Sequence, residues 1–114
     1  MGGNVQDKSF YFAIRIVNLC KILRNERREY VLSKQLLRSG TSIGANIAEA
    51  QQAQSRADFL SKLNVSLKET TETIYWLKLL EATDDLTREE FDSIVKDCIE
   101  LEKILTVSVR EMKK

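Results

Sequence analysis

Residues 60–77 place small or apolar side chains at alternating intervals of three and four, in a stripe of Leu60, Leu63, Leu67, Thr70, Ile74 and Leu77. A helix brings positions with this spacing onto one face, whereas a half-buried strand needs an interval of two. The chain of 114 residues has no proline and only four glycines, so it lacks the frequent turn residues of a sheet protein. The sequence therefore predicts an all-α protein.

Three other segments have the same period. Residues 7–25 carry two apolar stripes, one of Phe10, Ala13, Ile14, Val17 and Cys20, and one of Phe12, Ile16, Leu19 and Leu23. The later stripes are Leu32, Leu36, Ile43, Ile47 and Ala50, and then Phe91, Ile94, Cys98, Leu101, Leu105 and Met112. Four such helices with short turns predict one domain over residues 1–114, an antiparallel up-down-up-down four-helix bundle.

Helix starts are marked by residues whose side chains accept hydrogen bonds from backbone N–H groups. The second helix is expected to begin near Glu29 or Tyr30. Ser55 is a candidate N-cap of the third helix, and Thr87 with Glu90 has the spacing of a capping box for the fourth.

Residues 37–50, LRSGTSIGANIAEA, are rich in small and hydroxyl side chains. A phosphate-binding Walker loop needs Lys and Ser or Thr directly after its second glycine, but Gly44 is followed by Ala45 and Asn46. The apolar period also continues across both glycines. We therefore expect an unbroken helix in which Gly40 and Gly44 allow a neighbouring helix to approach closely.

A polar line runs through this stretch at helical spacing and consists of Gln35, Ser39, Ser42, Asn46 and Glu49. Ser and Asn are poor helix formers and are unusual choices for a solvent-exposed face. The favoured interpretation is a partly buried structural seam that bonds to neighbouring helices. A solvent face and a catalytic line are the alternatives.

The chain contains no histidine, which removes the commonest general base and the His-containing metal signatures. Cys20 and Cys98 fall on apolar stripes without metal-ligand spacing, so we expect reduced thiols in a cytoplasmic protein. No signal-peptide pattern and no membrane-length apolar run is seen. We expect no enzyme, catalytic residue, cofactor or metal site. One alternative is a carboxylate enzyme that binds Mg²⁺ through Glu49, Glu69 and Glu72.

The formal net charge of +1 hides an uneven distribution. Residues 1–62 hold ten Lys or Arg and five Asp or Glu, whereas residues 63–114 hold eight and twelve. The candidate nucleic-acid-binding residues are Lys21, Arg24, Arg27, Arg28, Lys34 and Arg38. Two alternatives to nucleic-acid binding are open. Residues 1–62 can face the acidic residues 63–114 of the same or a neighbouring subunit, or their cations can be ordinary solvent-exposed surface.

The third helix has more apolar surface than a single bundle can bury. In IYWLKLL, residues 74–80, only Lys78 is polar, and the first helix has a similar excess. A helix that is apolar on all sides is normally buried on all sides. The sequence predicts an oligomer interface containing Tyr75, Trp76, Leu79 and Leu80, with exposed aromatics on a monomer as the alternative.

Residues 35–80 resemble the four-helix-bundle proteins associated with intervening sequences of bacterial 23S rRNA genes. The matching residues are Gln35, Arg38, Ser39, Ser42, Ile43, Ala45, Asn46, Ile47, Ala48, Glu49, Phe59, Leu63, Lys68, Glu69, Glu72, Thr73, Tyr75, Trp76 and Leu77. The aromatic-led first helix and the capped fourth helix extend the likeness over nearly the whole chain. Ala50 departs from the family, which usually has Gly after the Glu.

The resemblance implies a bundle that assembles as a ring, commonly a homopentamer. It also implies similarity to the accessory protein of diversity-generating retroelements, which works beside a reverse transcriptase and nucleic acid. Some members carry a ribosomal-protein label. The expected function is therefore a non-enzymatic oligomeric module associated with RNA or DNA, and the alternative is a scaffold that binds another protein.

Overall fold

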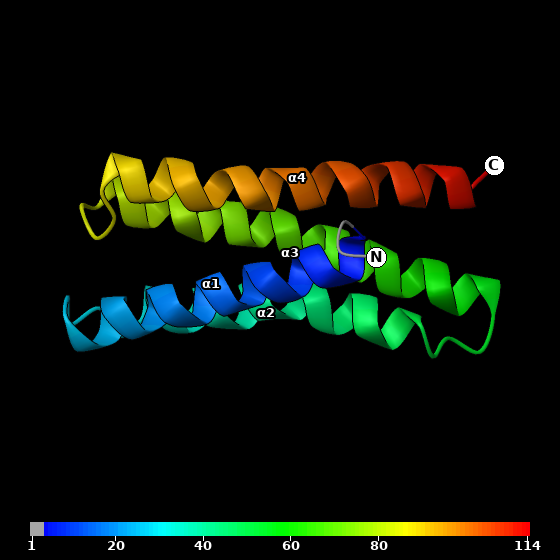
Figure 1. Cartoon of the computed structure of the whole chain (residues 1–114), viewed down its shortest axis with the longest axis horizontal. Helices are drawn as coiled ribbons and strands as arrows, with labels where there is room; N and C mark the ends of the chain where they lie inside the picture. Colours follow the sequence, from blue (N-terminus) through cyan, green and yellow to red (C-terminus); the bar gives the residue numbers. More distant parts are fainter. Residues whose placement is uncertain (1–3) are drawn as a thin grey trace.

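The computed structural model describes residues 4–114 and contains four helices (Figure 1). They are α1 (Val5–Asn25), α2 (Leu32–Ala50), α3 (Arg56–Ala82) and α4 (Arg88–Met112). No strand occurs among the described residues, which confirms the all-α prediction. Residues 1–3, which the single-domain prediction includes, lie outside the described part. None of the helices in residues 4–114 combines the length and apolar character that a membrane crossing needs.

Side-chain caps fix where three of the helices begin. Ser55 Oγ accepts from the backbone N–H of Asp58 at 3.0 Å at the start of α3. Thr87 and Glu90 form the reciprocal capping box of α4, with bonds of 3.1 and 2.8 Å. These two starts confirm the sequence prediction. Asn4 caps α1 in the same way by accepting from the N–H of Asp7.

Helix α2 begins at Leu32, two to three residues later than predicted. Arg28 adopts a left-handed backbone with φ of 57°, and the N–H of Glu29 then bonds to the carbonyl of Leu23 at 2.8 Å. The Glu29 carboxylate accepts from the backbone N–H groups of residues 31, 32 and 33. Glu29 therefore caps α2 from outside the helix.

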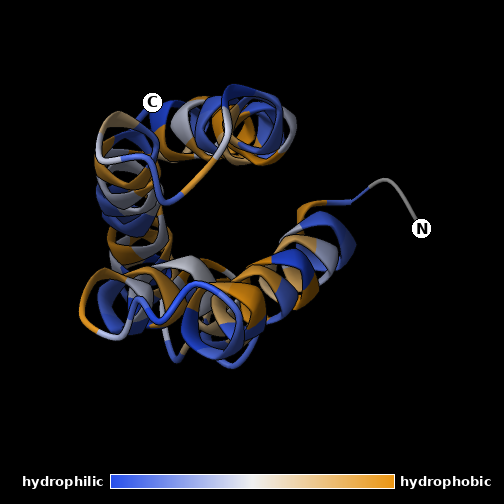
Figure 2. Cartoon of the chain, turned by 90° about the vertical axis from the view of Figure 1, so that its left-hand side faces the viewer, coloured by the Kyte–Doolittle hydropathy of each residue, from blue (hydrophilic) through white to orange (hydrophobic). Residues whose placement is uncertain are grey.

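The helices lie side by side, with the α1–α2 and α3–α4 loops at one end and the α2–α3 loop at the other (Figure 1). Helix α2 packs extensively against α1 and α3, and α3 against α4, whereas α1 and α4 have the smallest contact of these four neighbouring pairs. In Figure 2, α1 and α4 also stand further apart than the other neighbours. Charged side chains bridge them, including Lys8 with Glu100 at 3.2 Å and Arg15 with Asp97 at 2.7 Å.

The core is built from the predicted stripes of α2, α3 and α4. On α1 the core is formed by Phe12, Ile16 and Leu23 of one stripe, together with Cys20 from the end of the other stripe. Phe10 and Ile14 of the other stripe are 64% and 43% exposed. Helix α1 therefore presents apolar surface to solvent in this single chain.

Candidate nucleic-acid interface

The six predicted basic residues run from the last turns of α1, through the α1–α2 loop, onto α2, and all six are exposed. The Cys20 thiol donates to the Ser33 carbonyl at 3.4 Å, so the end of α1 lies beside the first turn of α2. The α1–α2 loop faces the viewer in Figure 2. The structure thus gathers most of these cations around one end of the bundle.

Arg27 is already engaged within the chain. Its Nη1 and Nη2 donate to the two carboxylate oxygens of Glu90 at 2.9 and 2.6 Å, and Nη1 also donates to the Asp85 carbonyl at 2.8 Å. Hydrogen bonding by Arg27 lowers the pKa of Glu90 to about 2, and the same bond raises the pKa of Arg27. Arg27 therefore ties the α1–α2 loop to the start of α4.

Arg38 is also engaged. Its guanidinium forms an ion pair with Glu69 at 3.6 Å and a hydrogen-bonded pair with Glu72. Both carboxylates belong to α3, so Arg38 links α2 to α3. Its charge is balanced locally and contributes less to an anion-binding surface than the sequence alone suggests.

The remaining four residues form no ion pair within residues 4–114. We call them the loop-end cations: Lys21, Arg24, Arg28 and Lys34. Arg24 places its guanidinium carbon 5.8 Å from the centre of the Tyr30 ring. Sequence reasoning missed Tyr30, although an aromatic that ends the charged run RNERRE was an available signal.

The residues of the predicted polar line on α2 have different environments. Ser39 is buried and accepts a 2.9 Å hydrogen bond from the Thr73 hydroxyl of α3. Glu49 is exposed and pairs with Lys62 of α3 at 3.1 Å. Gln35 is exposed. Two members of the line therefore bond to α3.

Ser42 and Asn46 are half-buried and bond within their own helix. The Ser42 hydroxyl donates to the Arg38 carbonyl at 2.6 Å, and Asn46 Nδ2 donates to the Ser42 carbonyl at 2.8 Å. The expected bond from Asn46 to another helix is not formed. A side chain one turn after an exposed backbone carbonyl reaches that acceptor more readily than a neighbouring helix.

Helix α3 supplies three buried hydroxyls that sequence reasoning largely missed, and two of them bond to α2. Ser66, Thr70 and Thr73 are all buried, and Ser66 donates to the Ile43 carbonyl of α2 at 2.8 Å. Their intervals of four and three, in phase with the leucine stripe, were the available signal. The α2–α3 contact is therefore partly a hydroxyl seam.

The three carboxylates of the alternative enzyme interpretation are separated into different ion pairs. Glu49 pairs with Lys62, whereas Glu69 and Glu72 both pair with Arg38. The described chain brings no three Cys, Asp or Glu side chains together in a metal-binding arrangement. Burial raises the pKa of the Cys20 thiol to about 11 and that of Cys98 to about 12. Both thiols are therefore protonated and poorly nucleophilic at neutral pH.

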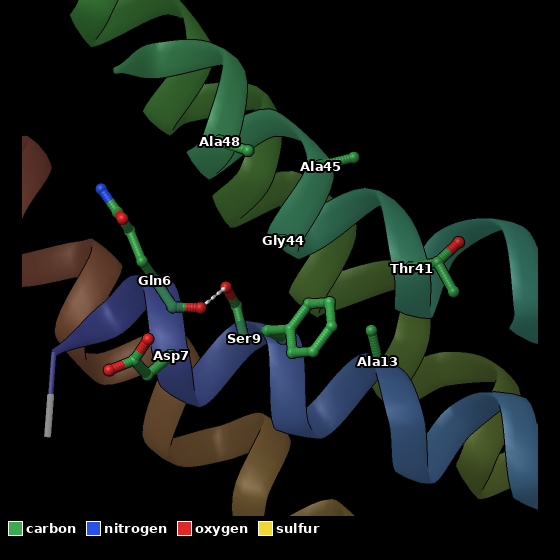
Figure 3. Close-up of a pocket in the computed structure, with 9 residues that line it drawn as sticks. Gln6, Asp7, Ser9, Ala13, Thr41, Gly44, Ala45 and Ala48 are labelled. Atoms are coloured by element: carbon green, nitrogen blue, oxygen red, sulfur yellow. Dashed lines mark hydrogen bonds between the residues drawn. The ribbon is translucent and has the colours of Figure 1, made fainter. Parts of the chain in front are cut away.

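A groove of about 490 Å³ lies on the outer side of the α1–α2 contact (Figure 3). It is lined by Gln6, Asp7, Ser9, Phe10, Ala13, Thr41, Gly44, Ala45 and Ala48. A Cβ on Gly44 would lie 3.3 Å from the backbone oxygen of Ser9, so the glycine lets the α1 backbone come close. The groove offers few polar groups to a ligand, because small and apolar side chains dominate it.

The predicted oligomer-interface residues divide between surface and core. Tyr75 is 58% exposed, and Trp76 and Leu79 are half-buried. Leu80 is fully buried in the core of its own chain, so its assignment to an interface is wrong. The position lies on the same face as Leu77 and Thr73, which point toward the other helices.

Comparison with known proteins gives matches along nearly the whole chain. The sequence pattern of the 23S rRNA-intervening sequence protein family matches residues 3–107. A crystal structure of a protein of unknown function from the S23 ribosomal protein family, from Bacteroides thetaiotaomicron, is similar with a TM-score of 0.92. It shares 60% sequence identity, over 93% of this chain and 98% of that chain. No curated protein matches the chain.

Proposed function

The chain belongs to the 23S rRNA-intervening sequence protein family, and from this premise we propose that it is a non-enzymatic, oligomeric module that binds RNA or DNA. The observation that carries the proposal is the group of loop-end cations. They are exposed around the α1–α2 loop, whereas the two other predicted cations, Arg27 of the loop and Arg38 of α2, are already neutralised by internal carboxylates. Charge that is not balanced locally is available for phosphates.

The proposal predicts recognition of the nucleic-acid backbone with little base-sequence preference. The loop-end cations are Lys and Arg side chains on two helix ends and the loop between them, and the sequence has no recognition-helix motif with grouped base-reading residues. Affinity should fall steeply with salt, because each phosphate that is neutralised releases counterions. In an oligomer, the surface recurs once per subunit and strengthens binding by avidity.

The test is the salt dependence of binding to labelled RNA and DNA. Replacing Lys21, Arg24 and Lys34 by Gln should weaken binding and reduce the slope of log affinity against log salt by about one for each phosphate that is no longer neutralised. Lys68, Arg110 and Lys113 are exposed cations that form no ion pair in the described chain and line neither apolar patch, and their replacement by Gln is the matched control. Failure of the wild-type protein to bind either nucleic acid at low salt contradicts the proposal.

We also propose that the bundle is antiparallel and assembles with further copies of itself, with a ring of five favoured by the family resemblance. The placement of consecutive loops at opposite ends supports the antiparallel order. Two different apolar patches support a ring, which needs unlike surfaces on each subunit. One is Phe10 with the α1–α2 groove. The other is the hollow beside the exposed Tyr75, which is lined by apolar side chains including Ile74 and Ile99 and by charged ones including Lys78 and Glu102.

Charge favours a second copy as the occupant of these patches. The first patch belongs to the half of the chain with a cationic excess, and the second to the half with an anionic excess. Contact between α1–α2 of one copy and α3–α4 of the next therefore brings opposite charges together. A monomer mass by light scattering at micromolar concentration contradicts the assembly.

Two other functions are distinguished by simple measurements. A protein scaffold is favoured by the same exposed apolar surface, and it predicts salt-insensitive capture of a protein partner without nucleic-acid affinity. The carboxylate enzyme using Glu49, Glu69 and Glu72 predicts a rise in melting temperature with Mg²⁺. The ion pairs that already hold these carboxylates support the non-enzymatic proposal instead.

A further inference from the structure

Tyr30 is an exposed aromatic side chain in the middle of the cationic surface. It is 49% exposed, and the next residue, Val31, is 72% exposed. The other two tyrosines, Tyr11 and Tyr75, lie within α1 and α3 and not in this loop. Exposed aromatic rings among cations are the elements from which single-stranded nucleic-acid surfaces are built.

The orientation of Tyr30 is set by a well-connected loop. The carboxylate of Glu29 is occupied by three backbone N–H groups at the start of α2, at 2.6 to 3.2 Å. The Ser33 hydroxyl donates back to the Glu29 carbonyl at 2.8 Å. Because these bonds fix the backbone on both sides of Tyr30, little ordering is required when a ligand binds.

Arg24 adds a second planar group at the same place. Its guanidinium carbon lies 5.8 Å from the Tyr30 ring centre, and Lys21 is one turn earlier on the same helix. Guanidinium planes and aromatic rings both stack on nucleic-acid bases. Tyr30 and Arg24 therefore offer stacking surfaces, while Lys21, Arg28 and Lys34 supply charge for the sugar-phosphate backbone.

We infer that this surface prefers single-stranded over duplex nucleic acid, with an unpaired base stacked on Tyr30; the inference rests on the proposed nucleic-acid function. In a duplex the bases stack on each other, so their faces are closed to Tyr30 and only the phosphates reach the cations. A single strand uses both the cations and the aromatic ring. Stacking needs a π face rather than particular hydrogen bonds, so base identity matters little.

The test compares binding of unstructured oligo(U) RNA with binding of an RNA duplex containing the same number of nucleotides. Tyr30→Ala should weaken oligo(U) binding by about tenfold and leave duplex binding unchanged. Tyr30→Phe keeps the ring and should bind as the wild type does. Tyr11→Ala removes another exposed tyrosine and is the matched control; Tyr11 is 63% exposed on α1.

The salt dependence separates stacking from charge. Tyr30→Ala should lower affinity at every salt concentration without changing the slope, whereas Arg24→Gln should reduce the slope as well. Equal binding of oligo(U) by wild type and Tyr30→Ala, or a wild-type preference for duplex, overturns the inference and leaves the proposed function standing. Absence of binding to both RNAs by the wild type overturns the proposed function and the inference with it.

Discussion

Arg27 and Glu90 form a two-pronged salt bridge between the α1–α2 loop and the first turn of α4, with N–O distances of 2.9 and 2.6 Å. Glu90 simultaneously accepts from the backbone N–H of Thr87 at 2.8 Å. One carboxylate therefore completes the α4 capping box and joins the two loops at the same end of the bundle.

The stability contributed by Glu90 should depend on pH. Hydrogen bonding to Arg27 lowers the pKa of Glu90 from the ordinary value of 4.5 to about 2. A depressed carboxyl pKa stabilises the fold above pH 4.5, and this contribution is lost as pH falls towards 2. Glu90→Gln keeps a capping acceptor but loses the charge. It should lower the free energy of unfolding by about 0.5–1 kcal/mol at pH 7, measured by urea denaturation.

Glu89→Gln is the control, because Glu89 is an exposed neighbour that forms no ion pair in the described chain. The difference between wild type and Glu90→Gln should shrink as pH is lowered through the window from 4.5 to 2. A difference that is the same at neutral pH and at the acid end of this window contradicts the role given to the charge.

Gly40 should be intolerant of alanine because α1 packs directly on it. A Cβ at position 40 would lie 2.8 Å from Cγ1 and 2.9 Å from Cγ2 of Ile16, and Ile16 is fully buried and β-branched, with little freedom to move. Gly40→Ala should destabilise the protein by about 1–3 kcal/mol in thermal or urea unfolding, although alanine favours helix by about 1 kcal/mol.

Gly44→Ala is the matched comparison. Its Cβ would lie 3.2 Å from the Ser9 hydroxyl and 3.3 Å from the Ser9 backbone oxygen, so α1 must move less than for Gly40→Ala, and Gly44→Ala should destabilise the protein less. In an Ile16→Ala background, Gly40→Ala should cost less than it does in the wild type, because Ile16→Ala deletes the Cγ1 and Cγ2 atoms that crowd the new Cβ. Equal stability of the Gly40 and Gly44 variants would show that α1 is free to move away.

The helices were predictable because hydrophobic period and capping are local. Ser55 and Thr87 were identified from two or three neighbouring residues each, and both caps are present. The start of α2 was not predicted correctly. Glu29 is a good helix former, and its place outside the helix follows only from the left-handed backbone of Arg28. An arginine with positive φ leaves no local signature in the sequence, since Asn and Asp are the side chains enriched in this conformation.

The candidate site was less predictable, because charge balance depends on residues that are distant in sequence. Arg27 is neutralised by Glu90 and Arg38 by Glu72, pairs that only the packing of the helices creates. A count of cations in the sequence therefore overstates the charge available for nucleic acid by these two residues. Leu80 was wrongly assigned to the oligomer interface for a different reason. Residues 74–80 are apolar on all sides of the helix, so the sequence did not distinguish the core face from the outer face.

Tyr75 should be required for assembly into an oligomer. It is 58% exposed on α3 and packs edge-on against Trp76 with ring centres 5.1 Å apart. Tyr75→Lys should reduce the mass measured by light scattering, because it introduces a charge into an apolar contact. Val107→Lys is the control at a similarly exposed apolar residue, which lies on α4 and lines neither apolar patch. An unchanged mass for Tyr75→Lys places the interface elsewhere.

Members of the polar line on α2 should contribute unequally to the free energy of unfolding, with Ser39 contributing more than Asn46. Thr73 and Ser39 are both buried, and their 2.9 Å hydrogen bond joins α3 to α2. Thr73→Val removes the donor and leaves part of the Ser39 hydroxyl without a partner, so it should cost about 1–3 kcal/mol. Asn46 is half-buried, and its side chain bonds only to the Ser42 carbonyl of its own helix.

Asn46→Ala should therefore change the free energy of unfolding by less than about 0.5 kcal/mol, since it replaces a half-buried side chain by the best helix former. The double variant Thr73→Val, Ser39→Ala should be more stable than the sum of the two single variants, because removing both partners leaves no unsatisfied hydroxyl. Urea denaturation of these variants beside the wild type provides the measurement. A larger destabilisation by Asn46→Ala than by Thr73→Val would mean that α2 and α3 are not held together at Ser39 but nearer the end of α2.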